Sequence, residues 1–202
     1  PAFNLKRIVT AEPIEIVLDE ALARADSHRN FEFYYLPGTG IAASIVHDLH
    51  EGEMTGLHPS NDDDEMLEGL KQLRDEYGWW PWLRKRIAQS ALPSGEVENV
   101  SDASLQLLAT TRPIKFNEME SHIPRENGLE VVRQVIAKMD RRKDAFFPME
   151  VRFTAPDDAW LSPFNGGPRM SIAIHAAVDE PYDYFFSEFE PIFREHGGRP
   201  HW

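Results

Sequence analysis

FFPMEVRFT at residues 146–154 and RMSIAIHAAV at residues 169–178 are the stretches that decide the fold of this chain. In both, apolar side chains alternate with polar or small ones, which is the pattern of a β-strand with one face on a core. A helical pattern of apolar residues over 127–139 comes before them, and an aromatic helical segment over 182–193 comes after. Because no βαβ unit repeats, this order predicts an α+β fold, an antiparallel sheet covered by helices.

The rest of the sequence adds more elements of the same kinds. Further strand patterns occur at residues 3–9, 30–36, 41–49 and 114–123. Pro13 begins a helical pattern that continues to about Ala25, and a turn cluster at Pro37-Gly38-Thr39-Gly40 separates two of the strands. We expect one domain over residues 1–202, with residues 51–100 as a helical insertion on the sheet and a polar loop near the end of that insertion.

Composition and charge exclude several classes of function. The formal net charge of the 202 residues is −13 and no Lys/Arg stripe offsets it, so we expect no binding to nucleic acid. The absence of cysteine excludes disulfides, thiol catalysis and thiolate metal sites. No apolar run approaches the roughly 18 residues of a membrane span, and the first residues have no signal-peptide pattern. A cytoplasmic protein is the simplest interpretation of these features.

One face of the strand at residues 149–154 carries an acid and a guanidinium. Glu150, Arg152 and Thr154 alternate with apolar neighbours and therefore share a face. The α-carbons of Glu150 and Arg152 are roughly 7 Å apart at this spacing, so the two side chains can brace each other or meet one bound polar molecule. The same spacing is also typical of an exposed ion pair on a half-solvated sheet.

The next strand presents His175 in the same manner. Ala173 and Ala177 flank it on its own face, which predicts room beside the ring for a ligand. Because imidazole titrates near neutral pH, His175 is a candidate for accepting a proton. A solvent-facing or simply hydrogen-bonded histidine has the same pattern.

Three other motifs suggest ligands at first sight. His47 and His50 resemble a metal pair, but on the strand expected here their rings point to opposite faces. Asp62-Asp63-Asp64 lacks the spacing of a calcium loop and is expected to cap a helix. We therefore predict no metal site. Trp79-Trp80-Pro81-Trp82 is expected to anchor a helix in the core, with stacking on a bound ring as the alternative.

The end of the chain resembles a family signature. His196-Gly197-Gly198-Arg199-Pro200-His201-Trp202 is similar to the closing motif, GGRPHW, of the D-arabinono-1,4-lactone/L-gulonolactone oxidase family. Other stretches are similar to that family in the same order, at residues 31–34, 117–120, 150–153, 157–163, 184–186 and 190–193. The resemblance covers most of the chain and is strongest from residue 113 onward.

This resemblance implies an FAD-linked oxidoreductase of the vanillyl-alcohol-oxidase type. In such enzymes an N-terminal FAD-binding domain of the same polypeptide holds most of the cofactor, and a C-terminal cap covers the flavin. The chain would be that cap, and it is expected to be inactive by itself. The implied reaction oxidises a CH–OH group of a sugar 1,4-lactone by hydride transfer to the flavin. Membrane association of the longer enzyme stays open.

The family motifs place four residues at the implied site. The Glu-x-Arg motif falls on Glu150 and Arg152, and the strand histidine of the family falls on His175. Arg152 would stabilise developing negative charge, Glu150 would orient it, and His175 would take the hydroxyl proton. By the same resemblance, His201 would contact the flavin from the cap side.

Two departures from the family pattern keep alternatives open. Ala177 stands where the related alditol oxidases have Thr, which disfavours an open-chain polyol as the substrate. Ser121 stands where a Tyr commonly follows Met-Glu. The alternatives are the cap of an alditol (xylitol-type) oxidase and a non-catalytic α+β binding module.

Overall fold

The computed structural model describes residues 3–56, 62–109 and 115–201. In these residues, eight strands form one sheet in the order β4-β1-β3-β2-β6-β7-β5-β8, and every pairing is antiparallel. The strands are β1 (Asn4–Pro13), β2 (Asn30–Leu36), β3 (Ile41–Leu49), β4 (Gly95–Ala103), β5 (Phe116–Pro124), β6 (Met149–Thr154), β7 (Arg169–Ala177) and β8 (Arg199–Pro200). The predicted α+β fold with an antiparallel sheet is confirmed.

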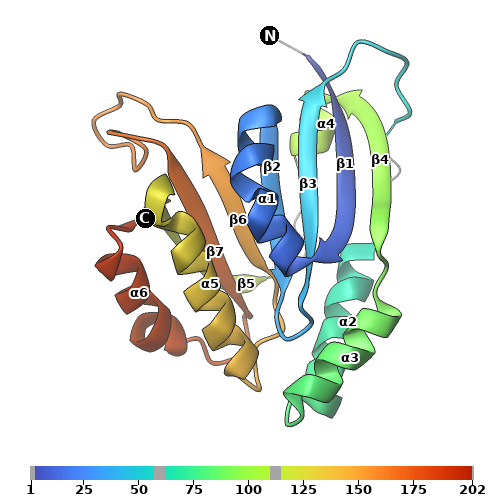
Figure 1. The fold of residues 1–202 in the computed structure, drawn as a ribbon, viewed down its shortest axis with the longest axis vertical. Helices are drawn as coiled ribbons and strands as arrows, with labels where there is room; N and C mark the ends of the chain where they lie inside the picture. The colour runs from blue at the N-terminus through green and yellow to red at the C-terminus, as the bar shows by residue number, and fades with distance from the viewer. Residues whose placement is uncertain (1–2, 57–61, 110–114, 202) are drawn as a thin grey trace.

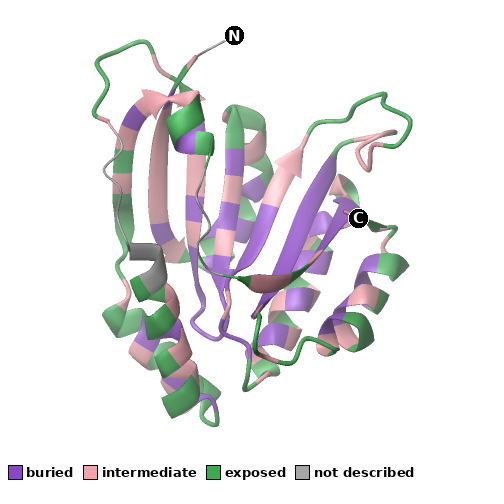
Figure 2. Cartoon of the chain, turned by 180° about the vertical axis from the view of Figure 1, so that it is seen from behind, coloured by how far each residue is buried: buried purple, intermediate pink, exposed green. Residues whose placement is uncertain are grey.

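Helices cover one face of the sheet and extend from one end of it (Figure 1). The covering helices are α1 (Ile14–Ser27), α5 (Arg125–Arg141) and α6 (Glu190–Glu195), and the π-helical turn η1 (Phe185–Phe189) leads into α6. The hairpin of α2 (Asp62–Tyr77) and α3 (Pro81–Ala91) lies at the end of the sheet, and the short α4 (Ser104–Leu108) follows β4. Figure 2 shows the opposite face, where α1, α5 and α6 do not cover the strands.

The core lies between the sheet and the helices that cover it, mainly α1 and α5. Both helices carry apolar residues at three- and four-residue spacing, which places those side chains on one stripe. The buried members of the stripes are Ile14, Val17, Leu18 and Ala21 in α1, and Val131, Val132, Val135 and Met139 in α5. They pack against strand residues such as Phe33 and Ile172, which are fully buried. Each buried Val, Leu, Ile, Phe or Met side chain among them contributes roughly 1.5–3 kcal/mol, so the core holds the helices to this face of the sheet.

The edge strand β4 was not predicted. Its residues, 95–103, were expected to belong to the end of the helical insertion and to a polar loop. The strand pairs along β1 and most of its residues are exposed or half-buried. An edge strand that buries neither face has no apolar alternation, and the sequence therefore gave no strand signal. β6 begins at Met149 and not at Phe146, and Pro148 just before it has no N–H to donate to a ladder.

The tryptophan cluster lies at the turn between α2 and α3. The prediction that it anchors a helix in the core is wrong. Trp79, Trp80 and Trp82 are 71%, 55% and 66% exposed. The helical hairpin buries Leu70, Arg84 and Ala88 in their place. The Lys143 ammonium lies 3.1 Å from the centroid of the Trp79 ring.

Two expectations concern parts of the chain at the limits of this description. The capping role expected of residues 62–64 depends on side chains that lie outside the described part of the chain. Ile114, the first residue of the strand expected at 114–123, also lies outside it. Among the described residues, no helix combines the length and the apolar character that crossing a membrane requires.

Candidate functional site

The strand register brings the predicted polar residues onto the uncovered face of the sheet. Glu150 and Arg152 of β6 lie opposite Ala173 and Ser171 of β7. Opposite residues of an antiparallel pair point to the same face, so the acid, the guanidinium and the β7 residues at odd positions, His175 included, lie on one side. β5 continues this face beyond β7, with Glu118 opposite His175, Glu120 opposite Ala173 and His122 opposite Ser171.

Arg152 lies between two buried carboxylates. Its guanidinium donates to Glu120 at 2.8 Å and lies 3.4 Å from Glu150, while the Tyr34 hydroxyl donates to Glu150 at 2.9 Å. Burial by itself would lower the pKa of Arg152, but Glu150 and Glu120 raise it, so the guanidinium keeps its charge. The Arg152 side chain is 38% exposed, against 4% for each acid. The two acids therefore fix the Arg152 guanidinium, which remains accessible from the uncovered face of the sheet.

Glu120 joins this ion pair to a pair of imidazoles. Burial raises the pKa of the Glu120 carboxyl, and Glu118 and Glu150 raise it further, while Arg152 and His201 act in the opposite direction. The backbone N–H of His201 donates to the Glu120 carbonyl at 3.1 Å, and β8 pairs with β5 just before it. The closing segment of the chain is therefore tied to the strand that carries Glu120.

The two imidazoles contact each other directly. His122 Nε2 lies 3.0 Å from His201 Nδ1, and His122 Nδ1 lies 2.7 Å from the Ser171 hydroxyl. Burial lowers the pKa of His122 to about 4, and the charges of His201, Arg152 and Arg169 lower it as well. His122 is accordingly neutral near pH 7, and one ring nitrogen of the pair donates its hydrogen to the other.

His175 shares the face but lies apart from this cluster. It is four residues, about 13 Å between α-carbons, from Ser171, which lies opposite Arg152 and His122, and two residues, about 7 Å, from Ala173, which lies opposite Glu150 and Glu120. Its Nδ1 donates to the Pro148 carbonyl at 2.8 Å, which places the lone pair of the neutral ring on Nε2. The Phe116 and Phe147 rings lie 5.1 and 5.5 Å from the ring of His175, which is 5% exposed. The expected open space beside His175 is filled by these rings.

Sequence reasoning missed Glu120 and His122. Glu118, Glu120 and His122 alternate along one face of β5 as Glu150 and Arg152 do along β6, and that alternation was the available signal. In the sequence, Glu120 stood out only as part of the stretch at residues 117–120 that is similar to the family. Nothing in the local pattern indicates that β5 lies beside β7.

A metal ion has one candidate set of ligands in the described part of the chain. Glu120, His122 and His201 each offer one ligand atom, and these atoms lie within 4.8 Å of one another. No metal site was predicted from the sequence, in which the candidate motifs were His47 with His50 and the acidic run Asp62-Asp63-Asp64. His47 is buried within β3 and His50 follows the end of that strand, and they are not part of the set.

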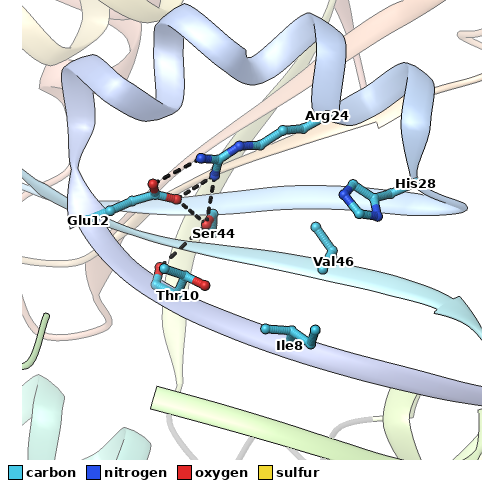
Figure 3. Close-up of a pocket in the computed structure, with 7 residues that line it drawn as sticks. All are labelled: Ile8, Thr10, Glu12, Arg24, His28, Ser44 and Val46. Carbon is cyan, nitrogen blue, oxygen red and sulfur yellow. Dashed lines mark hydrogen bonds and ion pairs between the residues drawn. The ribbon is translucent and has the colours of Figure 1, made fainter. Parts of the chain in front are cut away.

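A hollow of about 190 Å³ lies elsewhere, beside α1 and near β1 and β3 (Figure 3). Its cation, Arg24, bonds to Glu12, to Glu20 at 2.6 Å and to the Ser44 hydroxyl at 3.2 Å. Ser44 lies opposite Phe33, so the hollow is on the core side of the sheet, away from Arg152. An internal ion-pair network occupies these donors, and we do not consider the hollow a functional site.

Comparison with known proteins agrees with the motifs that this face carries. The family model described as D-arabinono-1,4-lactone oxidase matches residues 1–202. The chain belongs to the D-arabinono-1,4-lactone oxidase family.

The relatives of this lactone oxidase family member include enzymes named for sugar lactones. The chain is 29% identical over 214 residues to an L-gulono-1,4-lactone dehydrogenase of Mycobacterium tuberculosis, and 36% identical over 221 residues to an L-gulonolactone oxidase of Bos taurus. Both matches cover 100% of the chain and 48% of the relative. The chain thus spans about half the length of these relatives.

Solved structures show that the lactone oxidase family fold is shared more widely. A solvent-stable cholesterol oxidase matches with a TM-score of 0.67 at 16% identity, covering 100% of this chain and 49% of that one. A cholesterol oxidase from B. sterolicum matches with a TM-score of 0.62 at 12% identity, covering 100% of this chain and 48% of that one. At such low identities, these matches show the fold alone.

Proposed function

We propose that this chain is the substrate-side domain of an FAD-dependent oxidoreductase that oxidises a CH–OH group of a sugar 1,4-lactone. The observation that carries the proposal is the Arg152 guanidinium, held by Glu120 and Glu150 and half-open on the uncovered face of the sheet. Family membership supports the reaction class, and the names of the relatives support a lactone of the L-gulono-1,4- or D-arabinono-1,4- type.

The residues of this face fit a flavin and a polyhydroxylated substrate. Since the chain spans 48% of its relatives, we propose that the other part of the polypeptide holds most of the FAD. On this side, Arg152 and His201 are among the partly exposed polar groups, with 38% and 32% of their side chains accessible. When bound, FAD would supply the acceptor for a hydride from the substrate carbon.

Each residue on this face would have a distinct task in the reaction. Arg152 would stabilise negative charge on the substrate oxygen, because a guanidinium stays charged and is fixed here before the reaction begins. Glu150 would orient Arg152 and accept a hydrogen bond from a sugar hydroxyl. His175 would receive the hydroxyl proton at Nε2, a role that requires the substrate to reach a ring that is 5% exposed between Phe116 and Phe147. His201 would contact the flavin.

The test is the Arg152→Met change in the full-length flavoprotein. We expect the rate of flavin reduction by L-gulono-1,4-lactone to fall by ~10² or more, the usual loss when one donor to a developing oxyanion is removed. Anaerobic stopped-flow measurement of flavin bleaching checks this, with xylitol as the comparison substrate. Arg194→Met is the matched control, because the Arg194 side chain is 77% exposed on α6. An unchanged rate in Arg152→Met would remove Arg152 from the site, and faster bleaching by xylitol would favour the polyol alternative.

A further inference from the structure

We propose that Glu120, His122 and His201 form a binding site for a divalent transition-metal ion, for which Zn²⁺ is the natural probe. The proposal goes beyond the proposed oxidation, which requires no metal. It begins from the two ring nitrogens and the carboxylate that converge from β5 and from the segment after β8.

The spacing of the ligand atoms is close to that of a zinc site. Nitrogen and oxygen ligands at the usual Zn²⁺ distances lie about 3.4 Å from one another in a tetrahedron. Here His122 Nε2 and His201 Nδ1 are 3.0 Å apart, and His201 Nδ1 is 3.9 Å from Glu120 Oε2. Small side-chain rotations bring these three atoms around one ion and leave the fourth position open.

Two of the three ligands already have hydrogen-bond partners that orient them. The Ser171 hydroxyl lies 2.7 Å from His122 Nδ1, and this contact aims Nε2 of the same ring at the site. Arg152 donates to Glu120 Oε1 and leaves Oε2 toward His201. Metal-bound histidines and carboxylates are commonly oriented by such partners.

The local charge at the ligands is mixed. Glu118, Glu120 and Glu150 lie on this face, and Arg152 contacts two of them. Arg169 is a second cation nearby, since it donates to the His122 carbonyl at 3.2 Å, so the charge that compensates a Zn²⁺ ion would come from its ligand Glu120. Arg152 competes with the ion for Glu120, so its removal should strengthen metal binding.

The experiment is a titration of Zn²⁺ alone into the EDTA-treated chain, followed by calorimetry. We expect one saturable site that His201→Gln weakens at least tenfold. Ser171→Ala should weaken Zn²⁺ binding by roughly 10–100-fold, the usual effect of removing a hydrogen-bond partner of a metal ligand. His196→Gln is the control, since its Nδ1 bonds to the Ile192 carbonyl within α6 and not to this cluster. Circular dichroism confirms that each variant is folded.

The Arg152→Met variant separates the two proposals. It should slow flavin reduction in the full-length enzyme yet bind Zn²⁺ more tightly than the parent chain. Zn²⁺ binding that is equally strong in His201→Gln, that is lost equally in His196→Gln, or that is undetectable at millimolar metal would overturn the site and leave the proposed oxidation untouched.

Discussion

At the scale of single residues, His47 shows how burial makes stability depend on pH. It is 4% exposed in β3, and neither ring nitrogen has a hydrogen-bond partner. Burial lowers its pKa, and Arg7 lowers it further, while Glu98 and Asp48 act in the opposite direction. An unfolded chain takes up this proton as the pH falls below about 6.5, and the folded chain takes it up only at lower pH. The unfolded state then binds more protons, so His47 costs stability as the pH falls.

We expect His47→Gln to reduce the stability lost between pH 7.5 and pH 5.5. Gln has no proton to gain in this range, so the contribution of His47 to the slope disappears. Urea unfolding at each pH gives the free energy of unfolding, and the quantity compared between variants is its change from pH 7.5 to pH 5.5. His50→Gln serves as the control because the His50 ring contacts the Glu53 carbonyl at the surface. If His47→Gln and the parent lose the same stability on acidification, the buried imidazole is not responsible.

At the scale of elements, a close contact between α5 and the sheet is made possible by a glycine. A Cβ at Gly128 of α5 would lie 2.1 Å from Met170 Sδ and 3.0 Å from Met170 Cβ of β7. Gly69 of α2 is a matched helical glycine with nothing within 4 Å of such a Cβ. Helix propensity favours Ala over Gly at both positions, so any difference between them reports packing.

Gly128→Ala and Gly69→Ala are therefore expected to act in opposite directions. Gly69→Ala should stabilise the chain by about 1 kcal/mol through helix propensity. Gly128→Ala should destabilise it, because overpacking of about 1–3 kcal/mol exceeds that gain. Chemical denaturation of the two variants checks both. Stabilisation by Gly128→Ala would show that Met170 moves aside at little cost, and that α5 does not depend on this close approach.

At the scale of the whole molecule, the loop between β6 and β7 leaves two large apolar side chains in solvent. Trp160 and Leu161 are 97% and 99% exposed. The loop joins the strands that carry Arg152 and His175, and the chain spans about half of its curated relatives. We expect the other part of the polypeptide, which we propose to hold FAD, to cover this loop.

Trp160→Ser tests that expectation. In the chain alone its effect on the free energy of unfolding should stay within about 0.5 kcal/mol, as is usual for an exposed residue. In the full-length flavoprotein the same change should lower the thermal stability and ease FAD release, because an apolar contact is lost. Thermal denaturation of both forms and fluorescence of released FAD measure this. If Trp160→Ser leaves the thermal stability of the full-length protein as unchanged as that of the chain alone, the loop remains exposed in the complete protein.

Sequence alone predicted much of the sheet because strand alternation is a local property. The faces of β6 and β7 follow from period-two patterns in FFPMEVRFT and RMSIAIHAAV, which place Glu150, Arg152 and His175 on one side. β4 was missed since an edge strand with two solvated faces carries no alternation. The exposed tryptophans were misjudged because burial depends on where the helical hairpin lies, and hydrophobicity does not decide that.

The amino-acid order determined which residues face out from each strand and which family the closing motif resembles. Tertiary structure decided which strands are neighbours. By pairing β5 with β7 and β8 with β5, it joined Glu120, His122 and His201 to Arg152 and placed His175 two residues along β7 from the position opposite Glu120 and four from the position opposite His122. Strand pairing depends on contacts between residues far apart in the chain, and periodicity within one strand carries no record of them.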